Sequence, residues 1–464
     1  MVVRTPAGAS YEGLESALQV LLDHHDVLRA RLVRGGSVWN LEVGEPGAVR
    51  AVDVLRRAED GVTVAAEARA ARSRLVPESG VMVQAVWFEG AGRLLLVAHH
   101  LVVDGVSWRV LLPDLGRAYA GAVLEPVGTS FRRWADSLTT LDRSSELPLW
   151  EGQLSGGDVR VGSGVLDPVR DTAGTVRHLS LTLPVEVTAS LLTEVAARYR
   201  AGVNDVLLTG FALAVAGWRS DASTEVLVDL EGHGRESVVE GVDLSRTVGW
   251  FTSMFPVRLD AGSGGDLGRA LKRVKEQLHA LPDNGIGYGL LRYTDPETAT
   301  ALAAFAGPQI GFNYLGRFDA TAGEGGEWSL CSDVDLGDGR EPGMRLAHAL
   351  DLNAVTLDHA DGPRLVADWS WPAALFGEEE VRALAEGWFR ALRDLAAQAA
   401  TAEAGGLTPS DVGPLVSVSQ EQIEGLEAEH GRLTDVLPLS PLQQGLFFHA
   451  VYDTQGEDVY TVQL

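Results

Sequence analysis

The sequence predicts a protein of the α/β class with two hydrophobic cores. Short apolar runs bounded by turn residues, typical of buried strands, alternate along the chain with segments whose apolar residues recur at helical spacing. With 464 residues, 45% of them hydrophobic and 22% charged, the chain is long enough for two or more domains. These observations predict alternating helices and strands that close around more than one core.

The composition argues against several classes of function. The chain has 38 Lys and Arg residues against 64 Asp and Glu residues, and its net charge of −26 disfavours binding to a nucleic-acid backbone. Cys331 is the single cysteine, so neither an intramolecular disulfide nor a cysteine metal cluster can form. The longest apolar run, Val206 to Trp218, is shorter than the roughly 18 residues of a membrane-spanning helix. No signal peptide is apparent, and we expect a cytoplasmic protein without a nucleic-acid or membrane partner.

The first part of the chain predicts helices around a hairpin. A leucine stripe at helical spacing predicts a helix over 11–32, and the histidine pair inside it, His24 and His25, is interpreted as ordinary surface and core residues. A stretch rich in Gly, Asp and Ser predicts a linker or long loop at 152–175. The elements expected between them are a hairpin of strands 81–88 and 93–98, a helix ending near 119 and a helix over 131–141.

The turn after the 93–98 strand is the first candidate site. The apolar strand delivers His99 and His100 to this turn, and Asp104 and Gly105 signal the turn before a helix that contains Trp108. Because successive strand side chains point to opposite faces, at most one of the two histidines faces a given cavity, and their spacing leaves open which one. Asp104 is expected to fix the loop.

The second part of the chain predicts further strands and helices, with a second candidate site. Glu231, His233 and Arg235 follow an apolar strand, and the glycines between them allow a tight turn that approaches a ligand; a solvated surface turn is the default interpretation. Asn313 and Tyr314 present an amide and a phenol from a later strand. We expect strands at 175–183, 225–231, 309–318, 345–357 and 365–371, helices after Pro184, at 204–218 and at 378–396, and a strand or crossing segment at 247–257.

The two ends of the chain indicate neighbouring domains. Residues 1–10 leave no room for a proper domain start, which predicts an N-terminal truncation. From Thr401 the composition shifts to Ala, Gly, Ser and Glu, and a new apolar pattern begins at Leu437. The remaining residues are too few to bury a core. We therefore expect the beginning of another domain.

Five segments, in this order, resemble the epimerization domain of nonribosomal peptide synthetases. They are HHLVVDGVSWR at 99–109, EGHGRE at 231–236, TVGWFTSMFPV at 247–257, PDNGIGYGLLRY at 282–293 and FNYLGRF at 312–318, and the resemblance covers roughly 1–400. Condensation domains share the His-His-x-x-x-Asp-Gly core, but the Val-Ser-Trp continuation, EGHGRE and FNYLG are similar to epimerization domains. The segment LPLSPLQQGLFFH at 437–449 resembles the first motif of a following condensation domain.

The resemblance implies a fold like chloramphenicol acetyltransferase. Two α/β lobes would form a V-shaped pseudo-dimer with a central channel. The implied domains are an N-terminal lobe, truncated at its start, over 1–160, a C-terminal lobe over 161–400, a linker over 401–434 and the start of a condensation domain over 435–464.

The resemblance also implies an activity: inversion from L to D at the Cα of an aminoacyl or peptidyl thioester during nonribosomal peptide biosynthesis. The substrate is tethered to the 4'-phosphopantetheine arm of a peptidyl carrier protein, and the enzyme needs no metal or other cofactor of its own. Adenylation and condensation domains of the same or a neighbouring synthetase are the other implied partners. The alternatives are a condensation domain that forms peptide bonds and a catalytically dead fragment that docks a carrier protein.

The same resemblance assigns the acid and the base. Inversion removes the Cα proton and returns a proton on the other face, and the family's pattern places these roles on His100 and Glu231. A neutral imidazole accepts a proton at cellular pH, whereas a glutamate needs burial to become a useful donor. Tyr314 and Asn313 are candidates for stabilising the enolate or assisting proton transfer. The expected scaffold of the site is His99, Asp104, Gly105, Trp108 and Arg235.

Overall fold

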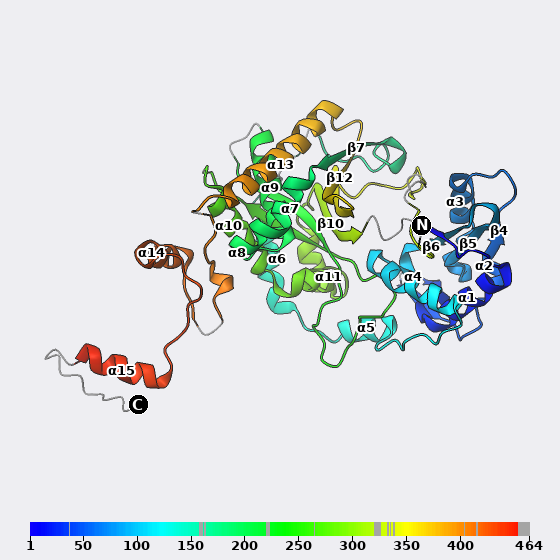
Figure 1. Cartoon of the computed structure of the whole chain (residues 1–464), viewed down its shortest axis with the longest axis horizontal. Helices are drawn as coiled ribbons and strands as arrows, with labels where there is room; N and C mark the ends of the chain where they lie inside the picture. Colours follow the sequence, from blue (N-terminus) through cyan, green and yellow to red (C-terminus); the bar gives the residue numbers. More distant parts are fainter. Residues whose placement is uncertain are drawn as a thin grey trace.

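A computed structural model divides the chain into a smaller N-lobe, a larger C-lobe and an extended C-terminal tail (Figure 1). The structure describes residues 1–452 except 37, 157–160, 162–163, 220–222, 264, 320–325, 332–333, 335, 337–338, 403 and 414–415. Residues 453–464, which belong to the segment predicted to begin a following condensation domain, and parts of the predicted 152–175 linker therefore lie outside the described residues.

The N-lobe is built on a four-stranded sheet with strand order β1-β6-β5-β4. Strand β6 is antiparallel to both β1 and β5, and β4 is parallel to β5. Helices α1 and α4 pack against each other, and their leucines form the lobe's core with the inward residues of the sheet. The bounds are β1 Val2–Arg4, α1 Tyr11–His24, β2 Ala30–Gly35, β3 Val38–Val43, α2 Ala51–Val54, β4 Leu55–Arg57, α3 Val64–Ser73, β5 Val83–Phe88, β6 Arg93–Ala98, α4 Gly105–Tyr119 and α5 Phe131–Leu138.

The predicted helix over 11–32 is wrong beyond residue 24. Helix α1 ends at His24, a 3-10 turn follows, and β2 then pairs with β3 in a separate two-stranded sheet. The 3-10 turn buries Leu28 and so prolongs the apolar stripe past the end of the helix. In β2 the burial alternates, with Ala30 and Leu32 buried and Arg31 exposed, which is the period of a strand.

The C-lobe is built on a six-stranded sheet with strand order β7-β12-β11-β10-β8-β9. Strand β10 is parallel to both β8 and β11, and the other neighbours are antiparallel. The bounds are α6 Leu147–Leu154, β7 Val176–Leu183, α7 Val185–Ser190, α8 Ala196–Tyr199, α9 Val203–Trp218, β8 Glu225–Gly232, β9 Ser253–Asp260, α10 Leu267–His279, α11 Ile286–Tyr293, α12 Pro296–Ala303, β10 Ile310–Asp319, β11 Leu350–His359, β12 Gly362–Pro372 and α13 Glu378–Ala399.

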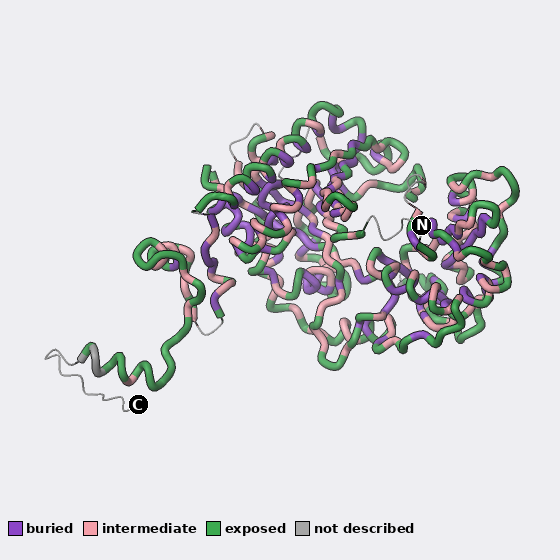
Figure 2. The backbone as a smooth tube through the Cα atoms, in the orientation of Figure 1, coloured by how far each residue is buried: buried purple, intermediate pink, exposed green. Residues whose placement is uncertain are grey.

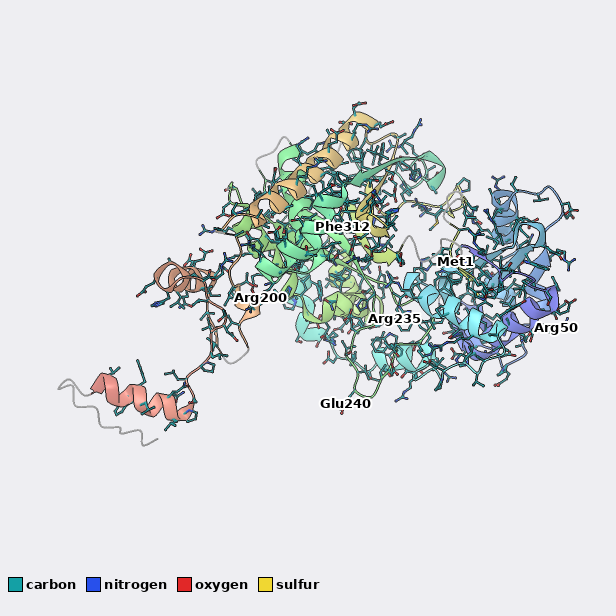
Figure 3. All side chains as sticks on the ribbon, in the orientation of Figure 1. Met1, Arg50, Arg200, Arg235, Glu240 and Phe312 are labelled. Atoms are coloured by element: carbon teal, nitrogen blue, oxygen red, sulfur yellow. The ribbon has the colours of Figure 1, made fainter. Side chains whose placement is uncertain are left out.

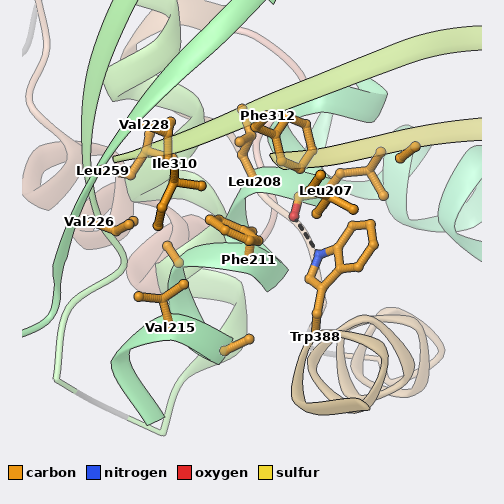
Figure 4. Close-up of a cluster of buried hydrophobic side chains, with 14 of the residues drawn as sticks. Leu207, Leu208, Phe211, Val215, Val226, Val228, Leu259, Ile310, Phe312 and Trp388 are labelled. Carbon is orange, nitrogen blue, oxygen red and sulfur yellow. Dashed lines mark hydrogen bonds between the residues drawn. The ribbon is translucent and has the colours of Figure 1, made fainter. Parts of the chain in front are cut away.

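Helices α9 and α13 bury one face of this sheet. Phe211 of α9 and Trp388 of α13 both pack against Phe312 of β10, and the Trp388 indole N–H donates to the Leu207 carbonyl over 3.0 Å (Figure 4). Apolar side chains of these elements exclude water from this face. Because strand side chains alternate, the residues on either side of Phe312 point to the opposite face.

The lobes exchange chain segments. Between β8 and β9 the chain crosses to the N-lobe, where Val248 is buried in the N-lobe core; we call residues 233–252 the crossing segment. Between β10 and β11 a second excursion pairs with the edge strand β1, with the Arg4 amide donating to the Ser329 carbonyl over 2.8 Å. Conversely, Trp150 of α6 is buried in the C-lobe core, ahead of the predicted boundary at residue 160. Figure 2 shows a buried interior in each lobe.

The tail packs its first part against the C-lobe. Leu407, Val412 and Ile423 form a small apolar cluster, and the buried Lys275 ammonium lies 2.6 Å from the Asp411 carboxylate. Helices α14 (Gln420–His430) and α15 (Pro441–Tyr452) follow, and α15 projects from the body with exposed apolar side chains (Figures 1 and 2). Phe447 is among them.

Across the described residues, no single helix has both the length and the apolarity to cross a membrane. Residues Val185–Tyr199 and Val203–Trp218 meet the criterion of length and composition only as a pair, with a bend of 102° between them. Ten residues of the second segment are buried inside the C-lobe.

Candidate active site

The end of strand β6 separates the two adjacent histidines. His99 is half-buried, its backbone N–H donates to the Met82 carbonyl over 2.8 Å, and its Nδ1 accepts from the Leu101 amide over 3.2 Å. Burial, and secondarily the neighbouring His100, lowers the pKa of His99. His100 begins a 3-10 turn and is exposed, and its ring centroid lies 4.5 Å from the Trp250 ring. His99 is therefore bound into the loop, whereas the His100 imidazole is free to meet a ligand.

Asp104 holds the histidine loop in place. Its carboxylate caps α4, accepting from the Ser107 amide over 2.7 Å, and also accepts from the Phe251 amide over 3.1 Å. The Arg235 guanidinium binds both carboxylate oxygens, over 2.7 and 3.1 Å. Burial raises the pKa of Asp104, but the bonds from Arg235 and Ser107 outweigh burial and lower that pKa overall. The pair stays ionised and joins the two lobes.

The remaining predicted scaffold residues surround this pair. Arg235 belongs to the crossing segment, lies between the lobes in Figure 3, and stacks over the Phe251 ring at 4.1 Å. Gly105 is the first residue of α4, and Trp108 packs against the N-lobe core. Of the predicted scaffold residues, His99, Asp104 and Arg235 therefore hydrogen-bond within the loop or between it and the crossing segment, whereas Trp108 lies on the core side of α4.

A left-handed glycine allows the crossing segment to approach this site. Gly234 has φ +67°, and a Cβ atom there would collide with the Phe251 carbonyl oxygen. His233, next to it, is exposed, and its Nδ1 accepts from the Arg235 amide over 3.0 Å. The turn at 232–235 is therefore an ordered part of the interface between the lobes, not a solvated surface turn.

Glu231 lies at the end of β8, on the sheet face away from α9 and α13. Phe312 pairs with Leu230, so Glu231 and Asn313 come next to each other, and the Asn313 amide donates to Glu231 Oε2 over 2.7 Å. Burial first, and then the Asp351 charge, raises the pKa of Glu231. His100 of the other lobe acts on the same carboxyl in the opposite sense. The two predicted acid/base groups thus lie within electrostatic range of each other.

Tyr314 does not join this group. It follows Asn313 and shares the helix-covered face with Phe312, and its hydroxyl lies 2.9 Å from Thr356 Oγ1 of β11. Burial raises the pKa of Tyr314. The structure therefore brings Asn313 to Glu231 and directs the Tyr314 phenol into the sheet's other face.

Three charged residues next to Glu231 are not predicted from the sequence. Asp229 precedes Glu231 by two residues on β8, and His348 lies between Asp229 and Asp351, 2.9 and 2.8 Å from their carboxylates. An acid at Asp229 inside an otherwise apolar strand was a usable signal, because residues two apart share a face. His348 and Asp351 gave no such signal in the sequence, because they come close to β8 only through the order of the strands in the sheet.

A cluster of His24, His25 and Asp114 has donor atoms close enough for a metal ion, all within 4.8 Å of one another. The Asp114 carboxylate there already accepts two bonds from Arg246, at 2.7 and 2.6 Å, and one from His25 at 3.0 Å. Arg246 therefore already supplies the positive charge that this carboxylate needs. We therefore assign this cluster a structural role in the contact between the two lobes.

Comparison with known proteins agrees with this architecture. The family model described as the condensation domain matches residues 1–412. The chain belongs to the condensation-domain family. Within the family, it is 37% identical over its whole length to one of the linear gramicidin synthase subunits of Brevibacillus parabrevis, and 35% identical over 97% of its length to chondramide synthase cmdD from Chondromyces crocatus. The chain spans only 6% and 12% of these relatives' lengths.

Solved structures of condensation-domain relatives share the two-lobed α/β fold. The epimerization domain from the third module of tyrocidine synthetase B superposes with a TM-score of 0.74 at 28% identity, over 86% of this chain and 92% of that chain. The first condensation domain of the CDA synthetase superposes with a TM-score of 0.56 at 20% identity, over 86% and 90% of the two chains. The second likeness concerns the fold alone. These relatives assign the chain to the condensation-domain superfamily of nonribosomal peptide synthetases.

Proposed function

We propose that this condensation-family chain epimerizes the Cα of an aminoacyl or peptidyl thioester held on the phosphopantetheine arm of a carrier protein. One observation carries the proposal: Glu231, a carboxyl whose pKa burial raises, is held by Asn313 within electrostatic range of the exposed imidazole of His100. Peptide-bond formation does not require such a second acid/base group opposite the histidine. The 28% identical epimerization domain of tyrocidine synthetase B supports the same activity.

Inversion then proceeds through an enolate-like thioester. One of the two groups removes the Cα proton, the electron pair of the broken C–H bond moves onto the thioester oxygen, and the other group delivers a proton to the opposite face of Cα. In one direction His100 is the base and protonated Glu231 the acid, and in the other direction the roles exchange. Each group is typically worth about 10²–10⁴ in rate. Asn313 fixes Glu231 Oε2 and so directs the carboxyl.

The substrate tether belongs to the carrier protein, and the proton transfers use this chain's own side chains. We therefore propose no further cofactor for the reaction. The carrier protein, and the adenylation and condensation domains of a synthetase, are the proposed partners.

The test supplies a carrier loaded with an L-aminoacyl thioester, with and without a second carrier bearing an amino-acid acceptor. Chiral hydrolysis and mass analysis then separate three outcomes. A changed L/D ratio without dipeptide supports epimerization. Dipeptide with an unchanged ratio overturns it in favour of condensation, and carrier binding without either product overturns it in favour of docking alone.

Variants connect that activity to the site. His100→Ala and Glu231→Gln should each abolish inversion, because each removes one of the two proton-transfer groups. Glu240→Gln, an exposed carboxylate of the same crossing segment (Figure 3), is the matched control and should invert at the wild-type rate. Inversion that persists in both site variants would remove these residues from the mechanism.

A further inference from the structure

An imidazole is held between two carboxylates on the sheet face that carries Glu231. His348 Nε2 lies 2.9 Å from Asp229 Oδ2, and His348 Nδ1 lies 2.8 Å from Asp351 Oδ1. His348 is 7% exposed, and its partners come from two strands, β8 and β11, that flank β10 in the sheet. We call Asp229, His348 and Asp351 the acid-histidine cluster.

The cluster carries one net negative charge. Ionised carboxylates only accept hydrogen bonds, so both ring nitrogens of His348 donate and the ring is an imidazolium. Burial lowers the pKa of His348, but the two carboxylate bonds outweigh burial and raise it to about 9. At neutral pH the cluster therefore holds two negative charges and one positive charge.

The strand between β8 and β11 leaves room for this cluster. Gly311 of β10 faces it, and a Cβ atom there would collide with Asp351 Oδ1 and lie 2.6 Å from His348 Nδ1. A cavity of about 30 Å³ is lined by the cluster together with Glu231 and Asn313. That volume holds about one water molecule, so the Cα of a tethered substrate cannot enter it. The cluster can act on the reaction only through Glu231.

We propose that Asp229, His348 and Asp351 are positioning residues for Glu231: the net negative charge of the cluster keeps the Glu231 carboxyl protonated and ready to donate, and His348 limits that effect by offsetting one of the two carboxylates. The catalytic consequence of this positioning rests on the proposed epimerization, whereas the electrostatic effect on Glu231 is present in the protein without substrate.

The charges around Glu231 determine whether each substitution should raise or lower its pKa. Asp351 and Asp229 raise the pKa of Glu231, whereas His348 and, from the other lobe, His100 lower it. Tyr288 of α11 lies within electrostatic range of the same cluster, since burial first, and then the Asp229 charge, raises the pKa of Tyr288 to about 12. Neutralising Asp351 removes a negative charge and should lower the pKa of Glu231. Neutralising His348 removes a positive charge and should raise it.

The experiment titrates Glu231 in the free, full-length chain by infrared difference spectroscopy. The carbonyl band of its protonated carboxyl is the band absent from Glu231→Gln. We expect Asp351→Asn to move the midpoint down, and His348→Gln to move it up, each by about one pH unit. Asp368→Asn is the matched control, because Asp368 is an exposed carboxylate on the neighbouring strand β12 and solvent screens its charge. Its midpoint should match wild type.

Opposite shifts from two substitutions in one cluster cannot come from general loss of structure, which would move both in the same direction. If His348→Gln does not fold, Asp351→Glu replaces it: this variant keeps the negative charge and should leave the midpoint near that of the wild type, whereas Asp351→Asn lowers it. Unchanged midpoints, or shifts of the wrong sign, overturn the inference.

The rate of Cα hydrogen exchange separates the inference from the proposed function. The pH at which kcat falls because Glu231 loses its proton should shift by as much as the infrared midpoint, whereas KM should change little. If the variants shift the infrared midpoint but the wild type does not exchange its substrate's Cα hydrogen, the proposed epimerization is overturned, and with it the positioning role of the cluster. The electrostatic effect of the cluster on Glu231 would then remain. Exchange with unshifted midpoints would overturn the inference alone.

Discussion

At the scale of single residues, the site depends on which face of a strand each side chain takes. Asn313 and Tyr314 are adjacent, yet one bonds Glu231 and the other bonds Thr356 on the opposite face. One hydrogen bond is worth about 0.5–1.5 kcal/mol net, so losing a correctly placed amide has a measurable cost. Losing a hydroxyl on the far face does not affect Glu231 directly.

We predict that Asn313→Ala lowers kcat for Cα exchange about tenfold, because the Glu231 carboxyl loses the donor that orients it. Tyr314→Phe, its neighbour, should stay within about twofold of wild type. Single-turnover exchange with a carrier-bound thioester measures both. A larger loss in Tyr314→Phe than in Asn313→Ala would make the phenol the more important group.

The candidate residues could be predicted from the sequence because they lie in continuous motifs. Strand alternation alone shows that Asn313 and Tyr314 face opposite ways. Which of them meets Glu231 could not be predicted, because it depends on the pairing of β10 with β8. The acid-histidine cluster has the same origin: Asp229 and Asp351 are far apart in sequence and meet only through strand order.

At the scale of elements, the turn after β8 determines how the lobes meet. Gly234 provides the left-handed backbone, and Arg235 then reaches the Asp104 carboxylate at the start of α4. The buried pair and the glycine are separate requirements, so each supports a prediction of its own.

Gly234→Ala should destabilise the protein by about 2 kcal/mol or more, because the new Cβ meets the Phe251 carbonyl at a left-handed φ. Gly289→Ala in α11 is the matched control. A Cβ there meets no atom within 4 Å, and alanine favours the helix by about 1 kcal/mol. Urea unfolding compares them, and equal stability in the two variants would contradict the role given to this turn.

Arg235→Leu should cost about 3–5 kcal/mol, since it leaves the Asp104 carboxylate buried without its partner. Arg132→Leu, which breaks an exposed pair with Asp136, should cost less than about 1 kcal/mol. Thermal unfolding of both variants, at the same pH and salt, measures the difference. A small effect for Arg235→Leu would mean that the pair does not join the lobes.

Periodicity predicted the hairpin before the histidines and the strands of the C-lobe, but it gave no prediction for β3, β4, α3, α10 or α12. Periodicity failed at Leu28, where a 3-10 turn continued a helical stripe into what is a strand. The 247–257 run predicts either a strand or a crossing segment, and it is both: its first residues cross to the N-lobe and β9 begins at Ser253.

At the scale of the whole molecule, a second buried ion cluster joins the lobes. His25 is 2% exposed, binds Asp114 of α4, and Arg246 of the crossing segment reaches the same carboxylate. Burial lowers the pKa of His25 to about 4. In the unfolded chain histidine titrates near its ordinary value of about 6.5.

The free energy of unfolding should therefore fall as the pH drops from about 6.5 towards 4, because His25 is protonated in the unfolded chain but stays neutral in the folded protein. The loss attributable to this group is about 3 kcal/mol. In His25→Asn that part of the pH dependence should disappear, so the difference between wild type and variant narrows as the pH falls. Urea unfolding at pH 6.5 and 4.5 measures it, and a constant difference would contradict the buried neutral imidazole.

The proposed mechanism places His100 and Glu231 on opposite faces of one carbon. A decisive experiment supplies L- and D-aminoacyl carrier thioesters separately and follows deuterium uptake at Cα in His100→Ala and Glu231→Gln. We predict that each variant still exchanges one epimer, the one whose Cα hydrogen faces the remaining group, and that the two variants retain opposite epimers. Exchange of both epimers at the wild-type rate in either variant, or retention of the same epimer by both, would contradict this mechanism.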